Sequence, residues 1–341
     1  MKKLVLFSII CFVFSIHAFT QDSHLFRSKP FDIFCHVQTV WGAVWNNDGS
    51  ELYTCGGERQ IAVINPETGE IIRKTESLPF ENYPKGIALN SSNQYVAYYI
   101  FNAYENDPVK IHNALSLEET ASIDGFETVA DIAFSPSGNV LYVSGFMGDK
   151  QVIAAYNVPD GSFSEIVASE AGLWSFDISP DGFYIVAAIT TEKHTGINIY
   201  DMENLRKIKS ISYPGQCNVV KFSRDGKSVA AGFYNNTAVV WSVPEGELKF
   251  SLKGFEGSVS DIDFSPDGKH IAITGMDPHQ TFAVYSAENG DLVQSMKIDC
   301  PYMNSVAWSP DGGLLALTYT NWGDVFKVAT IRIFSLEDYG K

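Results

Sequence analysis

A tight-turn motif recurs seven times along this 341-residue chain at an almost constant spacing. The copies read VWNNDGSELYTCG, ALNSSNQYVAYY, AFSPSGNVLYVSG, DISPDGFYIVAAI, KFSRDGKSVAAG, DFSPDGKHIAITG and AWSPDGGLLALTY. Their turn residues are Gly49, Asn93, Gly138, Gly182, Gly226, Gly268 and Gly312, so the successive separations are 44, 45, 44, 44, 42 and 44 residues. Glycine, and after it asparagine, adopts the positive φ that such turns need. A fixed period over most of a chain indicates a repeat architecture.

Each repeat contains the pattern of four β-strands. An alternating run such as SVSDIDF leads into the turn, and a second β-rich run such as HIAITG leaves it, as in a hairpin. A third run such as AVVWSV follows, then a second turn such as VPEG, and then a more variable run such as ELKFSLKG. Seven such units without a helical period predict an all-β fold, a seven-bladed β-propeller of four-stranded antiparallel blades, which exposes only short sheet edges.

The stretches GFEGSVSDIDFSPDGKHIAITG and TAVVWSVPEGEL resemble the WD-repeat β-propeller family, whose repeats have a histidine-containing start, a turn of this kind and a Trp-Asp end. The resemblance covers residues 29–341. Only Trp241 occupies the tryptophan position, Ser242 follows it in place of aspartate, and the Gly-His start is missing from every copy. The chain is therefore similar to a divergent member, and we expect its blades to lack the histidine, aspartate and tryptophan network of typical members.

The phase of the repeat predicts how the ring closes. The last copy ends with TIRIFSLEDYGK, just past a third strand, so its blade lacks an outer strand. The segment KPFDIFCHVQ, before Trp41, stands where the outer strand of a preceding blade would stand. We therefore expect residues 29–37 to pair with the three C-terminal strands and to close the ring by backbone hydrogen bonds.

The first residues have the pattern of a secretory signal peptide. Lys2 and Lys3 precede the apolar run LVLFSIICFVFSI, and Ala18 offers a plausible cleavage point. The run is shorter than the ~20 apolar residues of a spanning helix, and no later segment is apolar enough to span a bilayer. We expect residues 1–18 to be a signal peptide, 19–28 a short N-terminal segment and 29–341 the propeller of a secreted, periplasmic or lumenal protein. An uncleaved N-terminal anchor is the alternative.

Charge and cysteine usage exclude several classes of function. Loss of the two N-terminal lysines would take the formal net charge from −16 to −18, and so acidic a surface repels the phosphate backbone of a nucleic acid. Four cysteines would remain, and their wide spacing excludes a CxxC metal or redox motif. They are Cys35, Cys55, Cys217 and Cys300, and we expect free thiols rather than disulfides. Asn90 and Asn235 lie in sequons that matter only in a glycosylating host.

No linear motif of catalysis or metal binding occurs in the sequence. There is no G-x-S-x-G elbow, H-E-x-x-H zinc helix, phosphate-binding loop or dinucleotide fingerprint. The histidines lack metal-ligand spacing, and DIDFSPDGKHIA does not place glycine and an acid where a calcium loop needs them. We therefore expect a protein that is not an enzyme and holds no cofactor and no metal.

The loops of such a propeller divide between two faces. The turns between first and second strands, and between third and fourth, are rich in aspartate and glutamate, which we interpret as turn-forming residues rather than a site for a cation or a basic partner. The opposite face is rich in large aromatic residues, which favour recognition because they give large contact area at low entropy cost. The candidate partner-binding residues there are Trp41, Tyr83, Lys85, Phe101, Tyr104, Trp174, Phe233, Tyr234, His279, Tyr319 and Trp322, with Asn218 and Tyr302 on the same face.

These observations predict a monomeric, extracytoplasmic interaction scaffold that binds a protein, peptide or glycan through its aromatic loop face. The first alternative is a lactonase- or dehydrogenase-like enzyme, or a small-ligand binder, at the channel entrance. Asp131, Ser175, Asp261 and Ser305 lie there, near the beginnings of their strands. An enzyme would need the channel acids within hydrogen-bond reach of one another. The second alternative is a structural domain of a larger envelope or lumenal complex.

Overall fold

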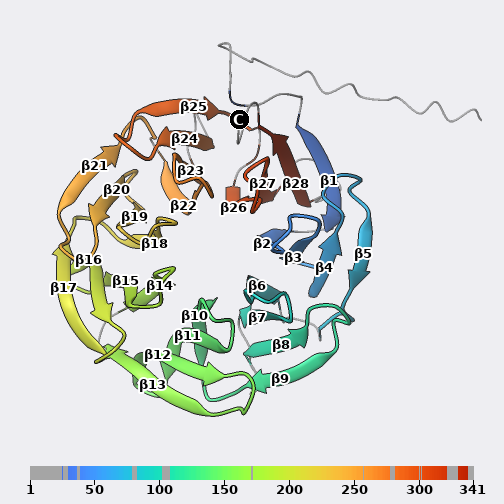
Figure 1. The fold of residues 1–341 in the computed structure, drawn as a ribbon, viewed down its shortest axis with the longest axis horizontal. Helices are drawn as coiled ribbons and strands as arrows, with labels where there is room; N and C mark the ends of the chain where they lie inside the picture. The colour runs from blue at the N-terminus through green and yellow to red at the C-terminus, as the bar shows by residue number, and fades with distance from the viewer. Residues whose placement is uncertain are drawn as a thin grey trace, which may run out of the picture.

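The computed structural model describes residues 25, 30–36, 39–78, 83–101, 108–169, 172–255, 257–276, 281–298, 300, 302–320 and 329–336. In these segments 28 strands form seven four-stranded antiparallel sheets, and no helix occurs among them. The sheets are arranged as the blades of a ring around a central axis, which is called the channel below (Figure 1). The predicted seven-bladed propeller is confirmed.

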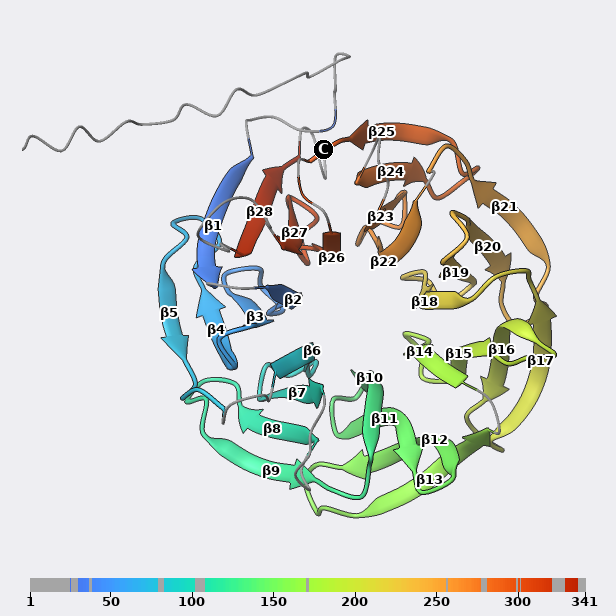
Figure 2. The same cartoon turned by 180° about the vertical axis from the view of Figure 1, so that it is seen from behind.

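Each blade runs from an inner strand near the central axis to an outer strand at the rim (Figures 1 and 2). Blade 1 is formed by β2 (Val40–Trp45), β3 (Leu52–Gly56), β4 (Gln60–Ile64) and β5 (Ile71–Lys74). Blade 2 is formed by β6 (Tyr83–Leu89), β7 (Tyr95–Phe101), β8 (Val109–Asn113) and β9 (Glu119–Ile123). Blades 3 and 4 are formed by β10 (Thr128–Phe134), β11 (Val140–Met147), β12 (Lys150–Asn157), β13 (Phe163–Ser169), and β14 (Gly172–Ile178), β15 (Tyr184–Thr190), β16 (Thr195–Asp201), β17 (Arg206–Ser212).

The remaining blades complete the circle. Blades 5 and 6 are formed by β18 (Cys217–Phe222), β19 (Ser228–Phe233), β20 (Ala238–Ser242), β21 (Leu248–Leu252), and β22 (Ser258–Phe264), β23 (His270–Met276), β24 (Phe282–Ser286), β25 (Leu292–Met296). Blade 7 is formed by β26 (Tyr302–Trp308), β27 (Leu314–Thr320), β28 (Ala329–Ser335) and, from the other end of the chain, β1 (Phe31–His36).

The hydrophobic core lies between the blades. One cluster joins Val186 and Ile197 of blade 4 to Phe222 and Val229 of blade 5, and similar clusters fill the other seams. The second and third strands are buried on both faces, which explains why runs such as SVAAGF are continuously apolar or small. Outer strands such as β17 are mostly exposed and carry polar residues. Blade packing, rather than any single sheet, therefore holds the ring together.

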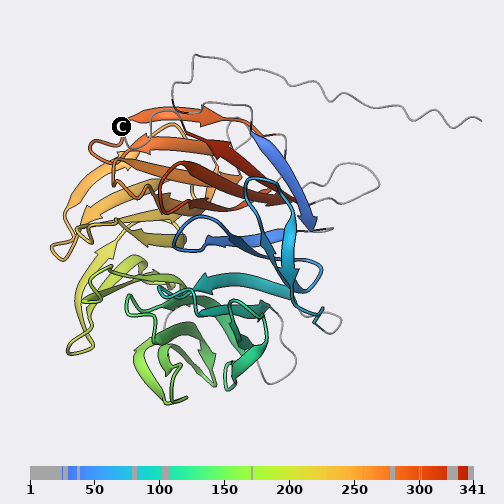
Figure 3. The same cartoon turned by 45° about the vertical axis from the view of Figure 1, so that its right-hand side comes forward.

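The predicted ring closure is confirmed. β1 pairs antiparallel with β28, with Phe31 opposite Ile333 and Ile33 opposite Ile331, and lies beside it in the oblique view (Figure 3). The Ile33 side chain is buried, and the Asp32 carboxylate accepts hydrogen bonds from Nε and Nη2 of Arg332 at 2.6 and 2.7 Å. The first strand of the described chain thus completes the last blade within the predicted segment 29–37.

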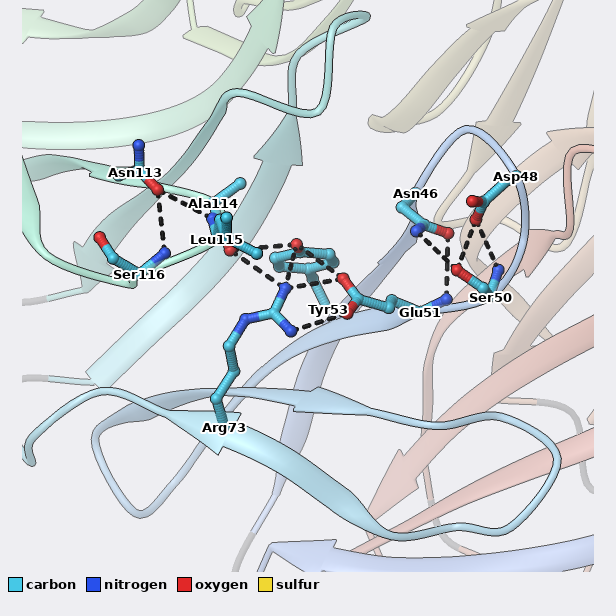
Figure 4. Close-up of polar contacts among 10 residues, drawn as sticks. All are labelled: Asn46, Asp48, Ser50, Glu51, Tyr53, Arg73, Asn113, Ala114, Leu115 and Ser116. Carbon is cyan, nitrogen blue, oxygen red and sulfur yellow. Dashed lines mark hydrogen bonds and ion pairs between the residues drawn. The ribbon is translucent and has the colours of Figure 1, made fainter.

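The seven turns between first and second strands share one geometry. The turn residues have φ between +57 and +77°, a conformation that non-glycine residues rarely adopt. In blade 1 the Asp48 carboxylate accepts hydrogen bonds from the Ser50 N–H and hydroxyl at 2.9 and 2.6 Å (Figure 4). Asp181, Asp225, Asp267 and Asp311 accept the equivalent backbone N–H in their own turns. These aspartates are committed to turn structure.

Polar contacts also tie neighbouring blades. Arg73 on β5 donates to both oxygens of Glu51 at 2.7 Å, to the Tyr53 hydroxyl at 2.7 Å and to the Ala114 carbonyl of blade 2 at 3.2 Å (Figure 4). Cys55 and Cys217 are buried free thiols, and the half-buried Cys300 thiol donates to Met303 Sδ at 3.3 Å. The Cys35 side chain lies outside the described residues. Within the described segments, no helix is long and apolar enough to cross a membrane.

Candidate functional site at the channel mouth

A β-bulge interrupts every inner strand near its beginning. In six blades the pairing with the second strand skips one residue, and in β14 it skips Trp174 and Ser175. The seven equivalent positions, each eight residues before a turn residue, are Trp41, Lys85, Ala130, Trp174, Asn218, Ser260 and Asn304. We call them the mouth ring, because they surround the channel end opposite the turns. A bulge re-aims its side chain and is common beside functional sites.

The mouth ring uses one position for two purposes. Asn304 donates from Nδ2 to the Val40 carbonyl of the next blade at 2.8 Å, and Asn218 donates from Nδ2 to the Val259 carbonyl of its next blade at 3.1 Å. These asparagines therefore tie blades together. Trp41 and Trp174 stand at equivalent positions but are 37% and 50% exposed. Large apolar rings held at the surface favour a partner contact over a structural one.

Other aromatic side chains lie on the same face. Tyr302 and Tyr234 are 43% and 60% exposed, and Tyr83 is half-buried. Tyr302 and Tyr83 begin the inner strands of blades 7 and 2, and Trp41 is the second residue of the inner strand of blade 1, which lies between them in the ring. Trp41, Tyr83, Trp174, Tyr234 and Tyr302 together are called the aromatic mouth below. Lys85, the charged member of the mouth ring, is half-buried, and burial lowers the pKa of its ammonium against the opposing effect of Asp131.

Two of the candidate partner-binding residues are buried, which corrects their assignment to the recognition surface. Phe233 is fully buried at the end of β19, with its ring centroid 4.6 Å from that of Tyr213 and 6.3 Å from that of Trp241. Tyr319 is also buried, in the core between blades 6 and 7, and the Arg332 guanidinium lies 5.7 Å from its ring centroid. Phe233 is the last residue of its second strand and Tyr319 is the penultimate residue of its own, and the side chains of second strands pack between blades.

Four other candidates cannot be placed. Tyr104, His279 and Trp322 lie outside the described residues, and so does the side chain of Phe101. They remain predictions from the sequence. Among the described residues, the exposed or half-buried aromatic side chains predicted for this face are those of the aromatic mouth.

The two channel acids of the enzyme hypothesis have separate partners. Asp131 Oδ2 accepts hydrogen bonds from the Ser175 hydroxyl at 3.0 Å and the Phe176 N–H at 3.3 Å. Asp261 Oδ2 accepts the Val306 N–H at 3.0 Å. Desolvation raises the pKa of both carboxyls to about 6. Each acid therefore ties its inner strand to that of the next blade, and among the described residues no hydrogen bond joins the two acids.

The same arrangement recurs at residues that the sequence reasoning missed. Asp177 accepts the Phe222 N–H at 2.7 Å, and Asp263 accepts the Trp308 N–H at 2.9 Å. The acceptor and donor are always 45 residues apart across a blade seam. Lys221 lies in the same channel wall, where the carboxylates of Asp177, Asp263 and Asp261 raise its pKa. The sequence did contain a signal for this role, because the inner strands carry aspartates at equivalent positions or two residues apart, as in Asp261 and Asp263.

Within the described segments, no group of three or more His, Cys, Asp or Glu side chains is placed to hold a metal ion. The geometry therefore offers a ring of inter-blade carboxylate contacts inside the channel and an aromatic surface at its mouth.

Comparison with known proteins agrees with this geometry. The profile of the WD domain, G-beta repeat family (WD40) matches residues 246–279. The chain is 22% identical over 252 residues to Protein HIR1 of Kluyveromyces lactis, covering 72% of this chain and 27% of that protein. It is 22% identical over 271 residues to the WD repeat-containing protein 26 homolog of Arabidopsis thaliana, covering 76% of this chain and 42% of that protein. The chain folds as a seven-bladed β-propeller and is similar to WD-repeat proteins.

A solved structure has the same fold as this propeller. The crystal structure of the Cps50 (Swd1) beta-propeller domain of Myceliophteria thermophila superposes with a TM-score of 0.75 at 13% identity, covering 92% of this chain and 100% of that one. The chain spans less than half the length of the two curated relatives. In its own propeller, Trp241 is buried in the seam of blades 4 and 5, and inner-strand aspartates join successive blades.

Proposed function

We propose that this propeller is a non-catalytic interaction scaffold that binds a protein or peptide through its aromatic mouth. The observation that carries the proposal is the contrast within the mouth ring. Asn218 and Asn304 use their positions to tie blades, whereas Trp41 and Trp174 expose indole rings at the same positions. Exposed tryptophans at the centre of a face are typical binding hot spots.

The chemistry of the mouth suits a partner with little net charge. Lys85 is the charged member of the mouth ring, and the other non-aromatic members are Ala130, Asn218, Ser260 and Asn304. Aromatic rings and neutral polar groups recognise apolar or uncharged polar side chains, with few charges to desolvate. A glycan presents related chemistry and is an outcome that the binding experiment distinguishes.

The binding experiment uses the mature protein, its Trp41→Ala/Trp174→Ala double variant, and Phe183→Ala as a matched control. Phe183 is 64% exposed on the turn face of the same blade as Trp174. Partners captured from the native compartment should bind the double variant more weakly by about 2 kcal/mol, roughly 30-fold in Kd, and the control normally. Equal binding by all three proteins would reject the aromatic mouth. Loss of binding after glycosidase treatment of the partner would identify a glycan.

We further propose that the protein is exported and monomeric. Support for export comes from the basic and apolar pattern of residues 1–18. N-terminal sequencing of protein purified from its native cells should begin near residue 19. A chain that retains Met1 and fractionates with the cytosol would contradict export. Analytical ultracentrifugation should give the mass of one chain.

A further inference from the structure

The turn face contains a seam that differs from three others. In three seams the proline of one turn packs against the turn glycine of the next blade. A Cβ placed on Gly182 would meet Pro136 at 3.7 Å, one on Gly226 would meet Pro180 at 3.5 Å, and one on Gly49 would meet Pro310 at 3.6 Å. At Gly268, no heavy atom of the described residues lies within 4 Å of that point.

The open seam follows from a single departure in the repeat. Arg224 stands at the turn position of blade 5 where blades 3, 4, 6 and 7 have proline. Its Nε donates to the Phe264 carbonyl at 3.2 Å and its Nη2 donates to Asp263 at 3.2 Å, so the side chain extends along blade 6 instead of covering Gly268. These bonds use two of the five guanidinium N–H groups, and the side chain is 47% exposed.

A cavity of about 370 Å³ occupies this seam between blades 5 and 6. Val240, Phe264, Pro266 and Ala287 supply apolar surface, and Arg224 and Lys249 supply two cations. Lys249 Nζ donates to the Ser228 hydroxyl at 2.9 Å, which leaves N–H capacity on the ammonium group. A cavity of this size accepts a group as large as one or two amino-acid residues.

Lys249 is a second, independent departure from the repeat. It is the bulged residue of β21, where the pairing of β21 with β20 skips one position in blade 5. The equivalent bulge residues of blades 1, 2, 3, 4 and 6 are Ile72, Thr120, Ile166, Ile208 and Val293. Two cations thus replace a proline and an uncharged residue in a single seam of an otherwise acidic chain.

The aspartates of the cavity wall limit the charge of a ligand. Asp225 accepts hydrogen bonds from the Ser223 hydroxyl and the Lys227 N–H, and Asp267 accepts those of Ser265 and Lys269. Both therefore serve the turn pattern that the other blades share. A dianion would be repelled by these carboxylates, whereas a single carboxylate can pair with the Arg224 and Lys249 side chains.

We propose that the cavity between the turns of blades 5 and 6 binds the C-terminal residue of a peptide, its carboxylate held by Arg224 and Lys249 and its apolar side chain held against Val240 and Phe264. Capture of a terminal carboxylate is a recurring mode of peptide recognition. The site is on the turn face, so it is separate from the aromatic mouth and does not depend on the function proposed for it.

The test uses immobilised mature protein and a peptide mixture whose last two positions are randomised. One half of the mixture has free C-terminal carboxylates and the other half has C-terminal amides. Free-acid peptides with apolar last residues should be retained about tenfold better than the amides. Arg224→Pro and Lys249→Val, which restore residues found in other blades, should each lose this preference, and Lys207→Gln on exposed β17 should keep it. Thermal melting verifies that each variant is folded.

Several outcomes would overturn the proposal. Equal retention of acids and amides, absence of retention, or an unchanged preference in the folded Lys249→Val protein would each do so. Inorganic phosphate that competes as well as the free peptides would show a bare anion site and reject the apolar half of the proposal. The Trp41→Ala/Trp174→Ala variant should retain the peptides normally, which separates this result from failure of the aromatic mouth.

Discussion

The two ends of the inner strands obey the repeat to different degrees. At the turn end, six glycines and one asparagine share a positive φ, and aspartates accept the same backbone N–H in blade after blade. At the mouth end, the equivalent positions hold tryptophan, lysine, alanine, asparagine and serine on a common bulged backbone. The backbone is repeated at both ends, but the side chains are repeated at only one.

This difference distinguishes residues that stabilise the ring from residues that are available for binding a partner. A turn residue that departs from the repeat changes the backbone conformation, because few side chains tolerate positive φ. The side chain at a mouth position can change without affecting the hydrogen bonds between strands, because the bulge already leaves the backbone of that residue out of the strand pairing. Variation among internal repeats therefore indicates function. On the turn face, where most side chains are repeated, Arg224 and Lys249 are residues that depart from the repeat in this way.

The largest expected effect concerns Trp241, the tryptophan at the repeat position. It is buried against Tyr213 and Phe233, with ring centroids 5.7 and 6.3 Å away. Trp241→Ala should lower the free energy of unfolding by about 3–5 kcal/mol, because it empties a large volume in the seam of blades 4 and 5. Urea unfolding measures this. A loss below ~1 kcal/mol would mean that Trp241 is not part of the structural framework.

A matched pair of turn glycines gives the next largest effect. A Cβ at Gly138 would meet Ser91 Oγ at 2.8 Å in addition to its positive φ, whereas at Gly268 only the φ of +72° opposes it. Gly138→Ala should cost about 2 kcal/mol and Gly268→Ala about 1 kcal/mol, since backbone strain is common to both. Thermal unfolding of the two variants checks the order. The reverse order would show that the seam of blades 5 and 6 is closed in solution.

The carboxylates of the turns and the channel should respond to pH in opposite directions. Hydrogen bonds from Ser50 lower the pKa of Asp48, so its contribution to stability is lost as the pH falls. Asp131 and Asp261 ionise near pH 6 when folded but near 3.9 when unfolded. Between these values the unfolded chain binds fewer protons, so their contribution makes stability fall as the pH rises from about 4 to about 6.

The measurement compares the wild type with Asp131→Asn and Asp261→Asn in chemical unfolding at several pH values. As the pH rises through that window, the free energy of unfolding of each variant should increase relative to that of the wild type by about 1 kcal/mol, after allowance for solvent screening. A difference that stays constant with pH would indicate that the channel carboxyls ionise as they do in water.

The smallest effect on stability is expected at Trp174. Its side chain is 50% exposed, and its bulged residue pair makes no ladder bond with β15. Trp174→Ala should change the free energy of unfolding by no more than ~0.5 kcal/mol, in contrast to Trp241→Ala. Differential scanning calorimetry of the two variants makes the comparison direct. Strong destabilisation by Trp174→Ala would place that indole in the framework.

Much of the fold could be predicted from the sequence because the period and the turn grammar are explicit in it. The spacing of the turn residues predicted the blades, and the phase of the last repeat predicted that residues near Ile33 complete blade 7. Both predictions depend on local patterns and on counting, which do not require knowledge of side-chain packing. The contacts across the seams are of another kind.

The site was predictable only in part. Exposure of Trp41 and Trp174 agrees with their positions at the beginnings of inner strands. Phe233 and Tyr319 were assigned to the same face, but each is one of the last two residues of a second strand and packs into a seam. The role of Asp177 depends on which backbone N–H of the next blade lies opposite it, and the blade packing decides that. Burial at strand ends and contacts between blades require the assembled ring.

The account rests most heavily on the claim that recognition occurs at the mouth face, and photo-crosslinking tests it directly. The photoreactive residue p-benzoylphenylalanine replaces either Trp174 or Phe183, both of which are exposed; Trp174 lies near the start of β14, and Phe183 lies in the turn between β14 and β15. Irradiation in the native compartment should join the partner covalently to the protein labelled at 174 and leave the protein labelled at 183 unmodified. An adduct of the same partner at 183, alone or equal in yield to that at 174, would contradict the account.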